Sequence, residues 1–253
     1  MIATNVMTIA PLTHREAMAL QRTELERTLA AIRSLEGADW TASTDCPDWD
    51  VRAMYQHVLG SCESGAFLRE NFHQLRRART HRRQHGGPLE AALSAVQVNE
   101  RRDLSALQIV ERMVAIAPKT VRGRSRTPGV VLKHAKLAVD GPVYEKWNLG
   151  YLIDTIYLRD LWMHRVDLSR AVNQTLDLSA EHDGRIVADV VSEWARRHGQ
   201  SFVLELTGAA GANYASGSDV VGTKGLSMDA VEFCRTLSGR APASGLLSTV
   251  VPF

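Results

Sequence analysis

A stripe of ionisable side chains on one predicted helix constrains the fold of this chain most strongly. From Val143 to Ala171 the sequence has few helix breakers apart from Gly150. Residues of this segment recur at alternating steps of four and three: Ile153, Tyr157, Asp160, His164, Asp167 and Ala171. Side chains three and four residues apart lie on one face of a helix. The pattern therefore predicts a helix whose inward face carries polar groups in its middle.

Several shorter helices are predicted before this segment. Their approximate ranges are 13–35, a helix from residue 51 that carries His57, 88–103 and 105–117. Asp50 suits the N-cap of the second helix, and Ser105 with Gln108 forms a capping box for the last. Two arginine-rich stretches interrupt the pattern: 69–85 is predicted as a helix end or mobile loop, and 119–128 as a turn-rich segment.

The pattern changes after Asn173. A helix is predicted over 179–198 and another over 227–237, with candidate strands at 202–207, 212–216, 219–222 and 246–251. We therefore place a domain boundary near residue 175. The predicted fold class is α+β, with a helical bundle over 1–175 and a small α+β domain over 176–253.

Composition excludes several classes of partner. A chain of 253 residues with 45% hydrophobic residues can bury a sizeable core, and a formal net charge of +2 is too balanced to predict nucleic acid or a membrane as the main partner. No uncharged apolar run approaches the roughly 18 residues that span a bilayer, and no signal-like leader is present, so a cytoplasmic protein is predicted. Three cysteines without paired spacing favour reduced thiols. Phosphate-cradle, dinucleotide and serine-hydrolase motifs are missing from the sequence.

Asp160 and His164 have the spacing of two ligands to one metal ion. Four residues apart on a helix, they can reach one ion without bending the backbone. His57, near the start of another amphipathic helix, is the best candidate for a third ligand. Two imidazoles and a carboxylate suit zinc or another divalent first-row ion, and three protein ligands leave one position open for catalysis. The competing interpretation is a surface pair or a buried histidine with satisfied hydrogen bonds.

Two sequence blocks carry a resemblance to a known family. The first is Cys46-Pro47-Asp48-Trp49-Asp50-Val51-Arg52 leading to His57, and the second runs from Asp160 through His164 to Asp167-Leu168. In this order they resemble the mycothiol-dependent maleylpyruvate isomerase family, within the DinB-like superfamily of metal-binding four-helix bundles. The segment from Phe202 to Gly208 and the run from Arg235 to Arg240 resemble the small C-terminal α/β domain that often follows in this family.

The resemblance implies a metal-binding enzyme that uses a thiol. His57, Asp160 and His164 would be the metal ligands, with no catalytic residue beyond them. Asp48 departs from the family's usual glycine, and Asp160 stands where the family usually has glutamate. Because aspartate is one methylene shorter, direct ligation with a shifted helix, ligation through water and no ligation are all open.

The function that this resemblance implies is a mycothiol-dependent transferase or isomerase, in which a metal-bound thiolate attacks an electrophilic small molecule. Its cofactors would be a divalent metal, with zinc as the expected ion, and mycothiol as thiol cosubstrate. The alternatives are a metal-dependent hydrolase of the same fold and a non-catalytic small-molecule-binding protein. Asp167 and Tyr157 are weighed as possible helpers of the site against ordinary core residues, and Cys62 is interpreted as a core residue. A monomer and a homodimer fit equally well.

Overall fold

The computed structural model describes residues 3–140, 144–217 and 225–253, and contacts divide the chain into two compact units. One unit is Thr13–Gln174, and the other joins Met1–Leu12 to Thr175–Phe253. The predicted boundary near residue 175 differs from this division in the first twelve residues. The reason is that β1 (Thr4–Asn5) pairs with β5 (Asn213–Ser216). Independent folding of the two parts stays a prediction.

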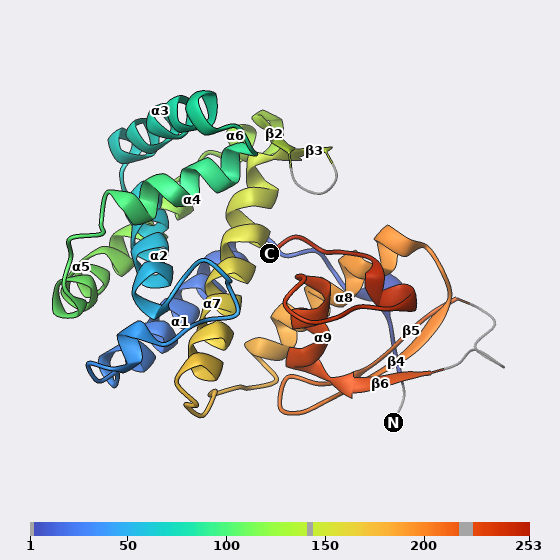
Figure 1. Ribbon diagram of the computed structural model, residues 1–253. Helices are drawn as coiled ribbons and strands as arrows, with labels where there is room; N and C mark the ends of the chain where they lie inside the picture. The colour runs from blue at the N-terminus through green and yellow to red at the C-terminus, as the bar shows by residue number, and fades with distance from the viewer. Residues whose placement is uncertain (1–2, 141–143, 218–224) are drawn as a thin grey trace. The chain divides into compact units, whose positions relative to one another are not determined.

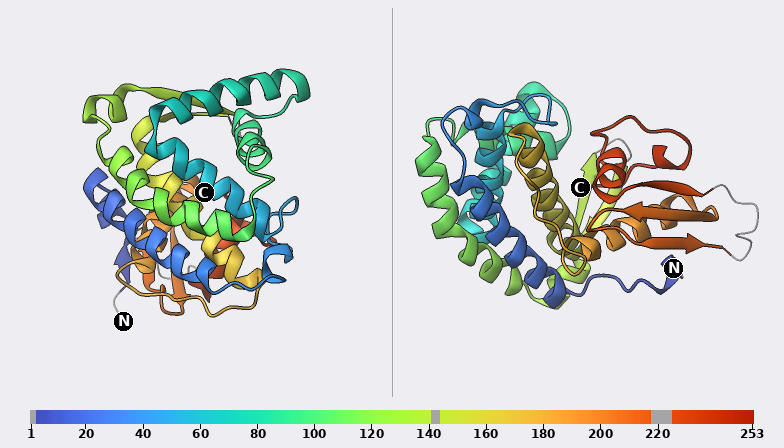
Figure 2. Two further views of the ribbon diagram at one scale, coloured as in Figure 1. Left: turned by 90° about the vertical axis from the view of Figure 1, so that its left-hand side faces the viewer. Right: turned by 90° about the horizontal axis from the view of Figure 1, so that it is seen from below.

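The larger unit is built on a four-helix bundle. Its helices are α1 (His14–Arg33), α2 (Val51–Ala66), α3 (Leu68–His85), α4 (Leu89–Asn99), α5 (Ala106–Ser125), α6 (Gly129–His134) and α7 (Tyr157–Ala171). Helices α1 and α2 each contact both α5 and α7, so these four close into a bundle (Figures 1 and 2). The predicted helical bundle is thus confirmed. The predicted caps are also confirmed, because Asp50 accepts from the Ala53 amide and Ser105 forms a capping box with Gln108.

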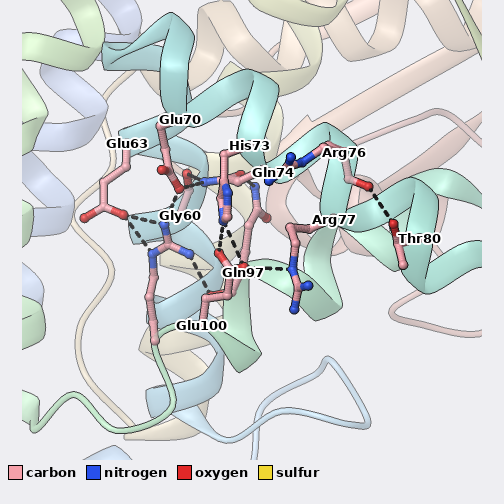
Figure 3. A network of polar contacts seen from close by, with 11 residues as sticks. Gly60, Glu63, Glu70, His73, Gln74, Arg76, Arg77, Thr80, Gln97 and Glu100 are labelled. Carbon is pink, nitrogen blue, oxygen red and sulfur yellow. Dashed lines mark hydrogen bonds and ion pairs between the residues drawn. The ribbon is translucent and has the colours of Figure 1, made fainter.

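The first arginine-rich stretch is helical, so the predicted helix end or mobile loop is wrong. It forms α3, which contacts α4 and α2. Figure 3 shows the polar network that ties these helices together. The buried Arg101 donates to Glu63 and, over 3.0 Å, to Glu70, while Gln74 donates to the Gly60 carbonyl over 2.9 Å. Contacts with residues of α2 and with Arg101 therefore stabilise α3, although its many neighbouring arginines disfavour a helix.

Helix α5 also extends further than predicted, because residues up to Ser125 of the second arginine-rich stretch are helical. The extension depends on close packing of glycines in α5 and α2. A Cβ atom on Gly123 would lie 2.2 Å from the Gly65 carbonyl oxygen and 3.1 Å from the Ala66 Cα. Backbone atoms cannot rotate away from such a contact, so only glycine fits where these helices meet.

We expect Gly123→Ala to lower the free energy of unfolding by about 3 kcal/mol or more, at the upper end of the cost of overpacking. Chemical denaturation measures the loss. Gly129→Ala is the matched control, because no atom lies within 4 Å of the added Cβ. Equal stability of the two variants would contradict the packing argument.

The segment before α7 is not one continuous helix, contrary to the prediction for Val143–Ala171. Strand β3 (Tyr144–Asn148) pairs antiparallel with β2 (Lys136–Asp140), and Val143 itself lies outside the described residues. A π-helical turn, Tyr151–Ile156, then leads into α7. Helix α1 holds this turn: Gln21 Nε2 donates to the Ile153 carbonyl over 2.5 Å, and His14 Nδ1 lies 2.6 Å from Asp154 Oδ1. Hairpin pairing overrides the local helical preference here.

The smaller unit is an α+β layer. Its strands pair in the order β1-β5-β4-β6, and its helices are α8 (Asp183–His198) and α9 (Ala230–Leu237); the remaining strands are β4 (Phe202–Thr207) and β6 (Leu226–Asp229). Strand β5 pairs antiparallel with β4, whereas β6 pairs parallel with it. Trp194 of α8 forms its core with Phe202 and Phe233 at ring-centroid distances of 4.8 and 5.3 Å.

The structure corrects two predictions for this unit and does not describe the residues of a third. The predicted helix over 227–237 starts only at Ala230, because the preceding residues pair as β6. The predicted strand over 246–251 is wrong, since its first residues lie in a 3₁₀ turn, Gly245–Ser248, that begins at a glycine with φ of 56°. The predicted strand over 219–222 lies outside the described residues.

Candidate metal centre

His57, Asp160 and His164 converge between α2 and α7. His57 Nε2 lies 3.7 Å from Asp160 Oδ2, and His164 Nε2 lies 3.2 Å from Asp160 Oδ1. The two imidazole rings are 5.3 Å apart between centroids, and one ligand atom from each of the three residues lies within 4.8 Å of the others. The fold therefore brings together all three residues that the sequence nominates as ligands.

These spacings fit one zinc ion. Zinc-to-ligand bonds of about 2.0–2.2 Å in a tetrahedron place neighbouring ligand atoms about 3.3 Å apart. One oxygen of Asp160 lies 3.7 Å from His57 and the other lies 3.2 Å from His164, so the carboxylate faces both imidazoles at distances on this scale. His57 is 9% exposed, and its buried Nδ1 has no hydrogen-bond partner in the described part of the chain. These three residues are therefore a group that could hold a divalent metal ion.

Asp167 orients His164 from the side away from Asp160. His164 Nδ1 and Asp167 Oδ2 are 3.2 Å apart, and Cys46 Sγ donates to the same oxygen over 3.6 Å. Asp167 is completely buried. A carboxylate that accepts from Nδ1 of a histidine fixes the ring so that Nε2 faces a metal. Asp167 thus contacts a ligand residue directly, and Cys46 reaches the site through it.

The charges of Asp160 and His164 favour each other. Burial opposes ionisation of Asp160, but His164 and His57 outweigh it and hold the pKa of this carboxyl well below its usual range. Burial likewise opposes protonation of His164, yet Asp160, Asp167 and Cys46 outweigh it and raise the pKa of this imidazole well above its usual value. The pocket therefore favours a carboxylate facing a cation, the electrostatic arrangement that a metal ion would take over.

The indole of Trp49 shields one side of the centre. The ring of Trp49, which precedes the N-cap of α2, lies 4.9 Å from the His57 ring and 6.1 Å from the His164 ring, centroid to centroid. The first sequence block thus supplies both a ligand and part of the wall beside it. An indole against imidazole rings limits their rotation and the access of water.

Arg124 is a neighbour of the centre that the sequence interpretation missed. Arg122 and Arg126, on either side of it, are exposed, whereas Arg124 is 2% exposed. Its guanidinium carbon lies 4.2 Å from the centroid of the Tyr157 ring, on the helix that carries Asp160. Arg124 faces inward because α5 continues as a helix through it. A turn-rich segment is expected here from the sequence, and such a segment does not predict which arginine is buried.

The cysteines differ in exposure. Cys62 and Cys234 are fully buried, and Cys46 is partly exposed. Burial raises the pKa of Cys62 to about 11, against the lowering effects of Arg124 and Thr120. The structure thus supports the interpretation of Cys62 as a core residue.

In the native protein we expect a water-soluble disulfide reagent at pH 8 to modify one thiol per chain, Cys46, because a buried thiol of high pKa reacts slowly. Denaturation should release the other two. Cys46→Ser is the control and should leave no fast-reacting thiol. A fast reaction at Cys62 would show that the interior of the bundle opens readily.

Comparison with known proteins agrees with this geometry. The fold is a helical bundle that brings two histidines and a carboxylate together between two of its helices. The sequence profile of the mycothiol maleylpyruvate isomerase N-terminal domain matches residues 21–169, more than half of the chain, and the chain belongs to this family of enzymes. The match spans both sequence blocks.

Solved structures show the same fold. The crystal structures of mycothiol-dependent maleylpyruvate isomerase and of a histidine-to-alanine mutant of it each superpose with a TM-score of 0.58, at 13% and 12% identity, covering 94% of this chain and 92% of theirs. No curated protein matches the sequence. Within the described residues, the helices are too short or too polar to cross a bilayer.

Proposed function

We propose that this enzyme is a metal-dependent, mycothiol-dependent transferase or isomerase that acts on an electrophilic small molecule. The observation that carries the proposal is the convergence of His57, Asp160 and His164 on one point, with ligand atoms within 4.8 Å. Family membership supports mycothiol as the thiol and maleylpyruvate-like compounds as the substrate class. Zinc is the proposed ion, because two imidazoles and a carboxylate are common ligands of catalytic zinc.

When bound, the ion supplies the positive charge that favours the thiolate form of mycothiol near neutral pH and leaves one position open for it. The residues of the chain do the rest. His57 and His164 would hold the ion through neutral imidazoles, and Asp167 would keep the proton of His164 on Nδ1. Trp49 limits water on one side of the two rings. No protein nucleophile is required.

Direct ligation by Asp160 is favoured over the alternatives of a shifted helix or an intervening water. The aspartate oxygens lie 3.2 and 3.7 Å from the two histidine nitrogens, close to the spacing of adjacent ligands of one zinc ion. The helix positions therefore suit the shorter side chain as they stand.

Metal content is the first test. The protein is purified without a metal-binding tag, and zinc is determined by elemental analysis in the wild type, His57→Ala and His164→Ala. About one zinc per chain in the wild type, lost in both variants, is the expected result. The zinc-loaded enzyme is then assayed for isomerisation of a cis-unsaturated keto acid with and without mycothiol.

Each outcome separates the candidate functions. Dependence on both zinc and mycothiol supports the proposal, whereas zinc-dependent, thiol-independent cleavage of esters or amides would favour the hydrolase, in which the open position activates water. If the wild type holds no stoichiometric zinc even after reconstitution, the metal-dependent proposal is contradicted and the binding-protein alternative is favoured.

A further inference from the structure

Arg124 is a buried cation with neutral hydrogen-bond partners. Its Nη1 donates to Gln21 Oε1 over 2.8 Å, and its Nη2 lies 3.3 Å from both the carbonyl and the hydroxyl of Ser61. Among the described residues, no carboxylate forms an ion pair with it. A buried charge without a counter-ion is costly, so this cation calls for an explanation beyond packing.

The position of Arg124 relates it to the metal centre. Ser61 lies one helical turn after His57 on α2, and Tyr157 lies one turn before Asp160 on α7. Arg124 contacts both of these residues, so it forms the next layer of the same space between the two helices. One helical turn, about 5 Å along each helix, separates this layer from the metal centre.

The ring of Tyr157 covers the guanidinium of Arg124. The hydroxyl of Tyr157 is available as a hydrogen-bond donor. The ring stacks at 4.2 Å from the guanidinium carbon, which limits rotation of the ring. Tyr157 is partly exposed, and its hydroxyl has no hydrogen-bond partner in the part of the chain that the structure describes. Residues 157, 160 and 164 follow at steps of three and four, so the phenol shares a helix face with two of the ligands.

We propose that the Tyr157 hydroxyl donates a hydrogen bond to an anionic oxygen, a carboxylate or an enolate, of the substrate at the metal centre, and that Arg124 is the positioning residue behind it. The inference rests on the proposed function.

Binding of maleate, a small cis-unsaturated dicarboxylate, tests the inference without turnover. Isothermal titration is performed on zinc-loaded wild type, Tyr157→Phe and the matched control Tyr144→Phe, whose tyrosine is 59% exposed on β3. Loss of one hydrogen bond to a charged group predicts about 10- to 100-fold weaker binding for Tyr157→Phe and wild-type affinity for Tyr144→Phe. Equal affinity of Tyr157→Phe and wild type, or no binding by the wild type, would overturn the inference.

A double-mutant cycle tests the role of Arg124. Arg124→Met should weaken maleate binding in the wild-type background but have little further effect in Tyr157→Phe, and Arg124→Lys should restore part of the affinity. Full additivity of the two changes would overturn the positioning role. If Arg124→Met does not fold, the test is completed with Arg124→Lys, which keeps a cation, and Tyr157→Phe, which keeps the aromatic ring.

Failure of this inference can be told apart from failure of the proposed function. Zinc content and mycothiol dependence report on the metal centre alone, and Tyr157→Phe should bind zinc as the wild type does. A zinc-loaded, mycothiol-dependent enzyme with unchanged maleate affinity in Tyr157→Phe would leave the function standing and remove only the role of Tyr157.

Discussion

Asp160→Ala should bind zinc at least about 100-fold more weakly than the wild type. Removal of residues that merely orient a ligand already costs about 10- to 100-fold in affinity, and Asp160 lies nearer to the proposed ion than any such residue. It is also the only carboxylate between the two imidazoles in the candidate centre, 3.2 Å from one and 3.7 Å from the other. Competition with a chromogenic chelator measures the dissociation constant.

Asp160→Glu is the matched variant, because it restores the residue that the family pattern carries at this position. It should keep zinc binding within about tenfold of the wild type, since it retains the carboxylate and changes only its reach. Unchanged zinc affinity in Asp160→Ala would show that the ion is held elsewhere and would remove this aspartate from the ligand set.

Arg165→Met is expected to lower the free energy of unfolding by about 3–5 kcal/mol. Arg165 on α7 and Glu24 on α1 form a bidentate ion pair, with Nε to Oε1 at 2.6 Å and Nη2 to Oε2 at 3.2 Å. Both residues are buried, at 3% and 0% exposure. Loss of the guanidinium leaves a carboxylate in the bundle interior, and urea denaturation measures the cost.

Two further variants check that reason. Glu24→Leu/Arg165→Met removes both charges and should be more stable than Arg165→Met alone, because the buried carboxylate is removed together with its guanidinium partner. Arg170→Met breaks the exposed pair with Asp45, 2.9 Å long, and should cost about 1 kcal/mol or less. A double variant less stable than the single one would indicate that the pair contributes net stability.

The sequence predicts those parts of the fold that depend on near neighbours. The stripe of Asp160 and His164 and the cap at Asp50 are local patterns, and the structure contains them where expected. His57 is nominated because it lies near the start of another amphipathic helix, and the resemblance to a family strengthens that choice, since an apolar helix face indicates packing in the bundle but not against which helix. The candidate site was therefore predictable through two blocks that lie more than a hundred residues apart.

Other features depend on distant partners, and local patterns could not predict them. Helix α3 carries many like charges, yet Gln74 and the Arg101 network hold it in place. The short β1 strand forms only because β5 lies beside it. The inward position of Arg124 depends on the close approach of Gly123 to Gly65, which no pattern within α5 reveals.

The wide π-helical turn before α7 allows the length of the β2–β3 hairpin to vary independently of the orientation of the helix that carries Asp160. An α-helical turn holds 3.6 residues, and a π turn closes its hydrogen bonds over one residue more. Tyr151–Ile156 therefore absorbs a residue between the β2–β3 hairpin and the helix that carries Asp160. Changes of hairpin length can be accommodated there without rotating Asp160 and His164. A residue inserted within α7 before Asp160 would instead rotate Asp160 and His164 by about 100° relative to His57. Tolerance of insertions should therefore fall abruptly at Tyr157.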